Sequence, residues 1–541
     1  MNMEVTLRKT SSSSANEVYR QRKNLQRQKK RKRIASDLNC SLLHELKNVP
    51  DCIHCGARRF EYEPPTFCCD NGKVKLAFSE VPPELDELFT AQSEEAINFR
   101  RNIRAYNSIF SFTSFGVKLD KELASARRGV YSFRAQGMVY HDLPGLIPQY
   151  TSPTFFQLYF YDTQSEFENR INIMQNQVLS EAVVQMLMKI LEINPYAKFF
   201  RRLKDYPSMD NVQLHISKDV NLDQRVYNSP HADQVAVIWV EGNNENIPLE
   251  RDIVVHAHSG DRHRIKHYYG CYDPLQYPLL FPKGETGWHQ NIRKIDPTSL
   301  VRNTNSVSTS TSLARTITAG DIISNEEQGV RRESVKNVSC REYICYKIQI
   351  RNPRQSILLL AGRLLQQYIV DMYIKLETTR LDYFRQNQST MRAELYQGIV
   401  DSVFNGELRG NEVGKRIVLP ATFIGGPRDM RRRYLDALTL VQRFGKPDLF
   451  ITMTCNPEWK EIQQALYDGQ TAQERPDLTT RVFRAKLQDL KYQLFKRKIF
   501  GHVAAHVDVV EFQKRGLPHV HMLIIFKSGH KLNTTSEIDN I

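Results

Sequence analysis

The stretch EFQKRGLPHVHMLIIF, from Glu511 to Phe526, places two histidines inside an otherwise apolar run. Its second part, HVHMLIIF, is rich enough in β-branched and apolar residues to predict a strand, and HVAAHVDVVEFQ (His502–Gln513) before it predicts another. Because the short connection KRGLP contains Gly516, we expect the two strands to pair as an antiparallel hairpin. This hairpin predicts a small antiparallel sheet in the C-terminal part of the sequence.

The two histidines are expected to share one face of their strand. Successive side chains of a strand point to opposite faces, so His519 and His521 point the same way, roughly 7 Å apart along the strand, while Val520 points to the other face. Two neutral imidazoles that point in one direction are suited to binding a divalent cation such as Zn²⁺ or Mn²⁺. Two ligands do not complete a site, so we expect a third across the hairpin.

The length of the hairpin loop decides which residue can be that third ligand. In a three-residue loop that ends at Gly516 in the left-handed conformation, Glu511 faces His519. In a two-residue loop Phe512 faces His519 instead, and the carboxylate points away. Glycine at the third loop position favours the first arrangement. We therefore predict Glu511 as the third ligand, with Gln513 as the alternative.

A lone His-x-His pattern is a weak signal, because histidines also occur as satisfied core or surface residues. The chain holds a second example, His256 and His258 in VVHAHS, which a polar segment follows. We interpret this second pair as structural or exposed. On the residues alone, the same interpretation stays open for His519 and His521.

Outward from the hairpin, the sequence predicts further elements of the same domain. The run PDLFITMTCNPEW (Pro447–Trp459) predicts a buried strand, because its core is β-branched and aromatic. Apolar residues at three- and four-residue spacing predict helices over Ile357–Asn387 and Arg481–Lys498. We therefore predict an α+β fold: a C-terminal antiparallel sheet with packed helices, preceded by a mixed α/β region and a small cysteine-rich, zinc-knuckle-like segment.

Composition divides the chain into five expected segments. These are a disordered basic arm over 1–48, a cysteine-rich zinc-finger-like segment over 49–78, an N-terminal globular region over 79–290, a Ser/Thr-rich linker over 291–335 and a C-terminal domain over 336–541. No apolar run reaches 18 residues and the N-terminal residues lack the apolar core of a secretory signal, so we expect no membrane association.

The cysteine-rich segment has a spacing close to that of zinc sites. Its candidate ligands are Cys52, Cys55, Cys68 and Cys69. Adjacent cysteines are an unusual second half of such a site, so one of them could face away, with His54 or Cys40 completing four ligands. Buried, reduced cysteines are the alternative interpretation.

The net charge of +15 is concentrated near the N-terminus, where residues 20–33 hold nine Lys and Arg and no acidic residue. Such a run is typical of nuclear targeting or of contact with phosphates, and a solvated tail is the alternative. Other basic groups predicted to contact DNA are Arg58, Arg59, Lys73 and Lys75 near the cysteines, and Arg431, Arg432 and Arg433 on a predicted helix. For the helix, a solvated face explains the arginines equally well.

Several of these stretches resemble Helitron rolling-circle transposon proteins of plants. The strongest are GLPHVHMLIIF, PDLFITMTCNPEW about 60 residues upstream, YDPLQYPLLFPKGETGWH and FGHVAAHVDVVEFQKRG. The resemblance extends from about Cys52 to Phe526. It implies that 79–290 is a Helitron N-terminal region and that 336–541 is a Helitron helicase-like domain of the HUH replication-initiator type.

The resemblance implies a nuclease chemistry as well as a fold. HUH enzymes hold Mg²⁺ or Mn²⁺ on the His–hydrophobic–His pair and one further polar residue, and a tyrosine attacks phosphorus in single-stranded DNA. By this resemblance His519 and His521 are metal ligands, and the strand with Phe450–Cys455 lies beside theirs. Helitron proteins also carry a similar cysteine segment near their start, which supports Zn²⁺ at the cysteine cluster.

The family's tyrosine nucleophiles lie on a helix downstream of the histidines, and in these 541 residues no tyrosine follows His521. Tyr492 is the nearest earlier candidate, and a packed or boundary residue explains it better. No G-x-x-x-x-G-K-[ST] phosphate loop occurs, and GNEVGKR (Gly410–Arg416) has the wrong spacing. We therefore expect a product truncated before the catalytic tyrosines and the helicase.

The function expected from the sequence is that of a nuclear, DNA-binding fragment of a Helitron transposase. It would hold an HUH metal site for nicking and strand transfer of single-stranded DNA and be unable to cleave alone. The alternative is a non-enzymatic DNA-binding protein derived from a Helitron, which uses the cysteine knuckle and the basic arm. A zinc-dependent hydrolase is a weaker idea, since no H-E-x-x-H arrangement is present.

Overall fold

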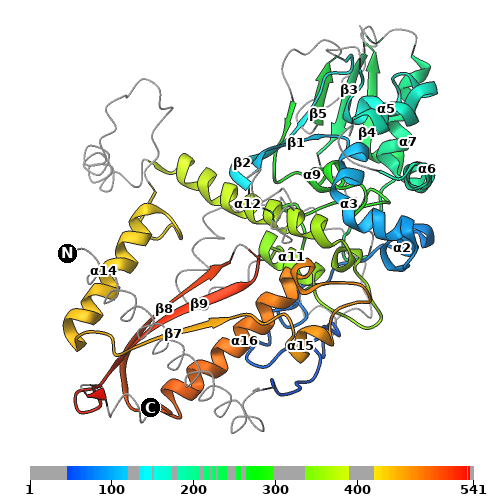
Figure 1. Cartoon of the computed structure of the whole chain (residues 1–541). Coiled ribbons are helices and arrows are strands. Elements are labelled where there is room, and N and C mark those ends of the chain that lie inside the picture. The colour runs from blue at the N-terminus through cyan, green and yellow to red at the C-terminus, as the bar shows by residue number, and fades with distance from the viewer. Residues whose placement is uncertain are drawn as a thin grey trace, which may run out of the picture. The chain divides into compact units, whose positions relative to one another are not determined.

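The chain divides into two units, Met1–Lys47 and Asn48–Ile541. The computed structural model describes residues 45–119, 133, 135–148, 152–173, 179–206, 209, 212–218, 222–226, 229–240, 252–256, 263–295, 336–388, 419–513, 515–532 and 534–535 (Figure 1). The basic run at 20–33, most of the expected linker, and His258 lie outside the described residues. The helices and strands of the described residues belong to the second unit.

The first half of the second unit mixes short helices with short strands. Its helices are α2 (Pro83–Thr90), α3 (Glu94–Phe110), α5 (Glu166–Asn172), α6 (Glu181–Ile190), α7 (Pro195–Arg201), α8 (Ala232–Val235) and α9 (Tyr272–Gln276). Its strands are β1 (Ser114–Leu119), β2 (Ala135–Leu143), β3 (Val212–Ser217), β4 (Ala236–Val240), β5 (Asp252–His256) and β6 (His263–Ile265). The strands form two three-stranded sheets, in the orders β1-β2-β6 and β4-β3-β5, and their pairs are antiparallel.

The second half contains longer helices and one further sheet. Its helices are α11 (Cys340–Lys347), α12 (Gly362–Gln386), α14 (Pro427–Phe444), α15 (Lys460–Gln463) and α16 (Pro476–Phe495). Its strands are β7 (Leu449–Thr454), β8 (Val503–Phe512) and β9 (Pro518–Phe526), in the antiparallel order β7-β9-β8. The predicted α+β class, with small antiparallel sheets, is confirmed. None of the described helices is both long and apolar enough to cross a membrane.

Local sequence explains where the principal helices begin. At α11, Ser339 and Glu342 form a capping box, in which each side chain accepts a hydrogen bond from the other residue's backbone amide. At α16, Pro476 occupies the first helical turn, where the missing amide hydrogen costs no bond. The observed helix therefore begins five residues before the apolar periodicity that predicted it from Arg481.

One large core joins residues from several of the expected segments. It contains cysteines of the knuckle region, Phe99 and Tyr106 of α3, Trp288, and Tyr368 of α12. The expected segments 49–78, 79–290 and 336–541 thus all contribute to it. Their boundaries stay predictions.

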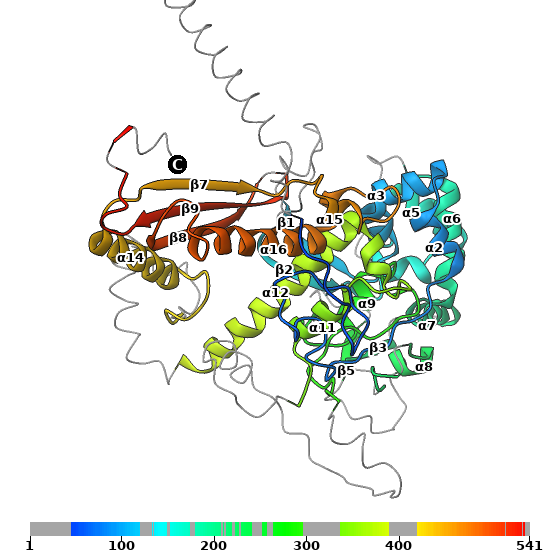
Figure 2. The same cartoon turned by 90° about the horizontal axis from the view of Figure 1, so that it is seen from below.

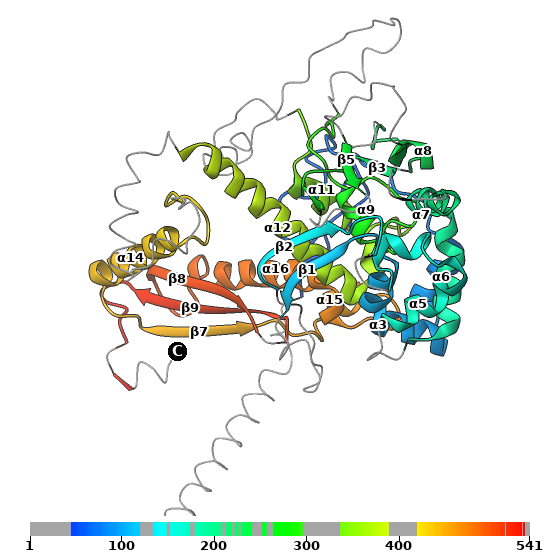
Figure 3. The same cartoon turned by 90° about the horizontal axis from the view of Figure 1, so that it is seen from above.

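The two faces of the C-terminal sheet differ in burial: one is buried along β9, and the other is buried at Ala505 and Ile525 but open at Val509 and Glu511. On β9, Val520, Met522 and Ile524 are at most 1% exposed and share a face. Asp508 of β8 lies opposite Met522 on that face and pairs with Lys491 of α16 at 3.0 Å. Helix α16 therefore covers this face, and Figures 2 and 3 show it running alongside the three strands.

Strand β7 forms one edge of this sheet, and its burial alternates along the strand. Phe450, Thr452 and Thr454 are exposed, whereas the residues between them are partly buried. The prediction of a buried strand is therefore wrong in part: the strand exists, but one of its faces is open. The apolar run LFITM hides this alternation, because Phe450 is as apolar as its buried neighbours.

Candidate metal centres

The β8–β9 hairpin has the register that places a carboxylate beside the histidines. Glu511 lies opposite His519, and the amide of Gln513 donates to the carbonyl of Leu517 at 3.0 Å. Gly516 has a φ of +73°, the left-handed conformation that glycine adopts readily. The register predicted from a three-residue loop is therefore confirmed, and Phe512 lies opposite Pro518 instead of His519.

This register brings together the three residues predicted as metal ligands. Possible ligand atoms of Glu511, His519 and His521 lie within 4.8 Å of one another. His521 Nε2 is 3.1 Å from Glu511 Oε1. A hard divalent cation with ligands at about 2.1 Å in octahedral geometry sets neighbouring ligand atoms about 3 Å apart. The Glu511–His521 pair has this spacing, and His519 lies close enough for all three residues to bind such a cation without Gln513.

The three predicted ligands differ in burial, which gives the candidate site one fixed side and one open side. His519 is 8% exposed, His521 is half-buried, and Glu511 is exposed. The two imidazole centroids are 4.5 Å apart with the rings at 76°. A ligand that reaches the site from solvent would approach past Glu511 and His521, while His519 stays held by the sheet.

Thr454 holds the buried histidine in place and was missed by sequence reasoning. Its Oγ1 is 2.6 Å from Nδ1 of His519, which lies directly opposite it in the β7–β9 pairing. When Nδ1 carries the proton, it donates to the hydroxyl and leaves the Nε2 lone pair for a cation. Only the register between β7 and β9 reveals this pair, and spacing along the chain does not contain it.

Replacing Thr454 by Val is therefore expected to lower Mn²⁺ affinity by about 10- to 100-fold, the usual effect of losing such a supporting hydrogen bond. The fold should persist, since Val suits an exposed strand position. Titration calorimetry with Mn²⁺ measures the change. Thr452→Val, at the neighbouring exposed position opposite His521, is the matched control and should keep wild-type affinity. Equal affinities for the two variants would contradict the role of Thr454.

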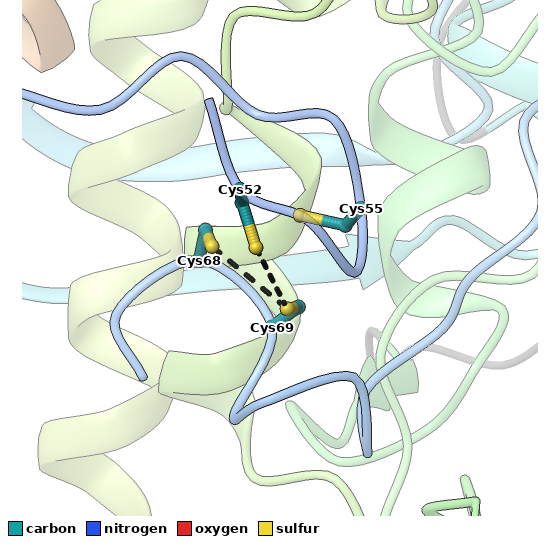
Figure 4. Close-up of side chains that lie close together, drawn as sticks. All are labelled: Cys52, Cys55, Cys68 and Cys69. Atoms are coloured by element: carbon teal, nitrogen blue, oxygen red, sulfur yellow. Dashed lines mark hydrogen bonds between the residues drawn. The ribbon is translucent and has the colours of Figure 1, made fainter. Parts of the chain in front are cut away.

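The four predicted zinc ligands also come together, and their side chains point toward a common centre in Figure 4. Their Sγ atoms lie within 4.8 Å of one another. Cys69 Sγ is 3.7 Å from Cys52 Sγ and 3.8 Å from Cys68 Sγ. A tetrahedral zinc site with Zn–S bonds of about 2.3 Å has sulfurs about 3.8 Å apart, so the cluster fits Zn²⁺.

Both adjacent cysteines belong to this cluster, so neither alternative ligand is needed. His54 is exposed, and Cys40 lies outside the described residues. The amide of Gly72 donates to Cys69 Sγ at 3.2 Å, and Gly72 has a φ of +84°. A backbone amide aimed at a sulfur stabilises the thiolate form that a metal ligand needs.

Ionisation of three of the thiols, those of Cys55, Cys68 and Cys69, is linked by their closeness. Hydrogen bonds from Cys68 and Cys69 lower the pKa of Cys55. The hydrogen bond with Cys55, together with burial, raises the pKa of Cys69 to about 12, and the same two causes raise the pKa of Cys68. Once one thiolate forms, its neighbours therefore keep their protons unless a cation compensates the charge.

The cysteine segment is held against helices from the second half of the unit. Arg481 of α16 pairs with Glu63 at 2.6 Å, with both side chains at most 10% exposed, and it also donates to the carbonyl of Arg58 at 2.8 Å. Arg351, just after α11, donates to the carbonyl of Cys55 at 3.0 Å. The segment is thus docked on the helix that supports the histidine strand.

The predicted DNA contacts differ in how available their side chains are. Arg58 and Arg59 are half-buried, and Arg59 donates to the carbonyl of Glu63 at 3.3 Å. Lys73 is half-buried and Lys75 is exposed. Of these four positions, only Lys75 offers an exposed cation beside the cysteine cluster.

On α14, the three predicted arginines are exposed, but two of them share a partner. Arg432 and Arg433 pair with the buried Asp429 at 2.7 and 2.9 Å, and Arg431 is exposed beside them. The hydrogen bonds from Arg433 and from the amide of Gly425 lower the pKa of Asp429. This pairing orients two guanidinium groups at the start of the helix.

A known family model matches the part of the chain that contains the histidine strand. Residues 343–524 match the family model described as the Helitron helicase-like domain at N-terminus. The predicted resemblance is confirmed for this segment, hereafter the Helitron-like domain, which is about one third of the chain. It contains Glu511, His519 and His521, whereas the cysteine cluster precedes it. None of the curated proteins compared with the chain matches it.

Proposed function

We propose that this chain is a DNA-binding part of a Helitron transposase. In this proposal the Helitron-like domain holds Mg²⁺ or Mn²⁺ for nicking and strand transfer of single-stranded DNA. The observation that carries it is the assembly of Glu511, His519 and His521 on one face of a hairpin within the matched domain. The basic run at 20–33 supports a nuclear location and sequence-independent contact with phosphates.

The site's residues support phosphate chemistry in a specific way. A cation bound there would polarise a scissile phosphate and stabilise the charge that develops on its oxygens. Thr454 fixes the ring of His519, and Glu511 supplies the carboxylate that faces His521. The open face around them, with Thr452 exposed, leaves a strand of DNA access to the ligands.

The tyrosine nucleophile that the Helitron resemblance implies has no assigned counterpart among the described residues. Within these 541 residues no tyrosine follows His521, and Tyr492 lies on α16, the helix that covers the opposite face of the sheet. We therefore propose that this polypeptide by itself binds the metal and single-stranded DNA without forming a covalent phosphotyrosine.

The decisive experiment compares Mn²⁺ affinity of the wild type with that of His519→Ala and His521→Ala. Each variant is expected to lose Mn²⁺ affinity by roughly 100-fold. Loss of a residue that only supports a ligand costs about 10- to 100-fold, and loss of a ligand itself should cost at least the larger of these values. His502→Ala is the matched control, because His502 and His530 form another close imidazole pair, with centroids 4.7 Å apart. Wild-type affinity in His519→Ala would refute the metal site.

The same variants separate this proposal from the alternative of a non-enzymatic DNA-binding protein. That alternative is favoured by the geometry of the cysteine cluster, which fits a zinc-stabilised segment next to exposed Lys75. Binding of a fluorescent single-stranded oligonucleotide should depend on Mn²⁺ in the wild type and lose this dependence in His519→Ala. Oligonucleotide binding that is independent of Mn²⁺ in both the wild type and His519→Ala would favour the non-enzymatic DNA-binding protein. A covalent DNA adduct on a denaturing gel would contradict the expected lack of cleavage.

A further inference from the structure

An exposed aromatic ring lies beside the histidine that faces solvent. Phe450 on β7 is 63% exposed, and its ring is parallel to the imidazole of His521, with centroids 5.5 Å apart and an angle of 8°. On the other side of His521, Val509 of β8 is 59% exposed. On this face of the sheet, two exposed apolar side chains, Phe450 and Val509, therefore lie on the two sides of the predicted metal ligand His521.

Covering these two side chains would stabilise a complex. Burial of apolar surface gives roughly 25 cal/mol per Å², and Phe450 and Val509 are 63% and 59% exposed, so a partner that covers them gains affinity. On the opposite face α16 covers β9, whereas Phe512 at the end of β8 is 60% exposed. The rings of Phe450 and His521 are stacked in parallel planes, so His521 lies on one side of the phenyl ring, and the 63% exposure of Phe450 leaves much of the ring for a partner to stack on.

The chemistry of the neighbouring groups narrows the identity of that partner. A protein surface apolar enough to cover Phe450 and Val509 would also bury the carboxylate of Glu511 and the imidazoles, at a large desolvation cost. A nucleotide avoids this cost when a cation is bound, because its phosphate would meet the cation held by Glu511 and the imidazoles, while its base offers a flat apolar surface next to that phosphate. In a duplex the base faces are already stacked, so a single strand suits the surface best.

We propose that Phe450 stacks on a base of single-stranded DNA whose adjacent phosphate lies at Glu511, His519 and His521. This inference rests on the proposed function and adds a positioning residue to it. Stacking is tolerant of sequence, because every base has an aromatic face. Phe450 would thus fix the position of the strand along the sheet without selecting a base.

The test uses the full chain and a fluorescent 20-nucleotide oligothymidylate in the presence of Mn²⁺. Phe450→Ala is expected to weaken binding by about tenfold, the typical effect of removing one stacking residue. Its Mn²⁺ affinity should stay that of the wild type, and Phe450→Trp should restore DNA binding. Phe512→Ala is the matched control: Phe512 is 60% exposed and lies on the other face of the same sheet. It should leave DNA binding unchanged.

A second measurement tests whether the lost contact is to a base. An oligonucleotide that lacks bases along its length should bind the wild type as weakly as the normal strand binds Phe450→Ala, and should not distinguish the two proteins. Unchanged binding of normal DNA by Phe450→Ala, with Mn²⁺ affinity intact, would overturn the stacking role and leave the metal site standing. Loss of the metal site itself would show in His519→Ala instead, so the two failures are distinguishable.

Discussion

Cys69→Ser is expected to abolish zinc binding and to destabilise the cysteine segment by on the order of 5 kcal/mol. Structural zinc contributes about 10–16 kcal/mol to the folding of isolated zinc-finger peptides. We expect less here, because Phe60, Val74 and Leu76 are also buried and keep part of the packing without metal. Elemental analysis of purified protein should give one zinc per chain for the wild type and none for the variant, and thermal unfolding should begin at a lower temperature.

The effect should reach beyond the knuckle, because the segment is docked on α16. Loss of the metal is expected to loosen the segment around Glu63 and so to weaken its nearly buried ion pair with Arg481. Arg481 belongs to α16, the helix behind the histidine strand. Cys345→Ser is the control, since it makes the same change at a half-buried thiol outside the cluster. The prediction is wrong if the wild type contains no zinc, or if the two variants unfold alike.

The parts of the candidate sites that could be predicted from the sequence are the local ones. The register of the hairpin follows from a three-residue loop and the left-handed Gly516, so Glu511 could be assigned before any coordinates. The cysteine cluster could likewise be predicted from the spacing of its residues, because Cys52 and Cys69 are only 17 residues apart in the sequence. Turns and short loops restrict geometry strongly enough for residue types alone to specify it.

The parts that could not be predicted depend on contacts between distant segments. Arg481 and Glu63 are 418 residues apart, and Thr454 and His519 are 65 apart. Neither contact produces a periodicity or a spacing that can be recognised in a single sequence. The exposure of Phe450 is similar, because an apolar residue in a strand looks buried until the neighbouring elements are known to leave that face open.

The second large effect is expected at a buried ion pair in the core. Lys375 of α12 and Asp273 of α9 are 2.7 Å apart, with side chains at most 1% exposed. Lys375→Met should cost about 3–5 kcal/mol, because it leaves the carboxylate buried without its cation. Arg385→Met is the control on the same helix. Its partner Asp382 and Arg385 itself are 38% and 41% exposed, so it should cost less than about 1 kcal/mol.

The loss of stability in Lys375→Met should also depend on pH, and the direction of this dependence distinguishes an unpaired carboxylate from lost packing as its cause. Burial raises the pKa of Asp273, and Lys375 opposes this rise in the wild type. Removing the lysine raises that pKa further, so the folded variant takes up a proton at Asp273 as the pH falls. A carboxyl whose pKa is raised on folding favours the folded state at low pH and loses that benefit as the pH rises through its folded-state pKa. Urea unfolding should therefore show a smaller difference from wild type at pH 5 than at pH 8.

Adding Asp273→Asn to Lys375→Met should recover part of the stability at pH 8 by removing the buried charge. A difference that grows toward low pH, or a double variant less stable than Lys375→Met, would mean that lost packing and not an unpaired carboxylate causes the effect.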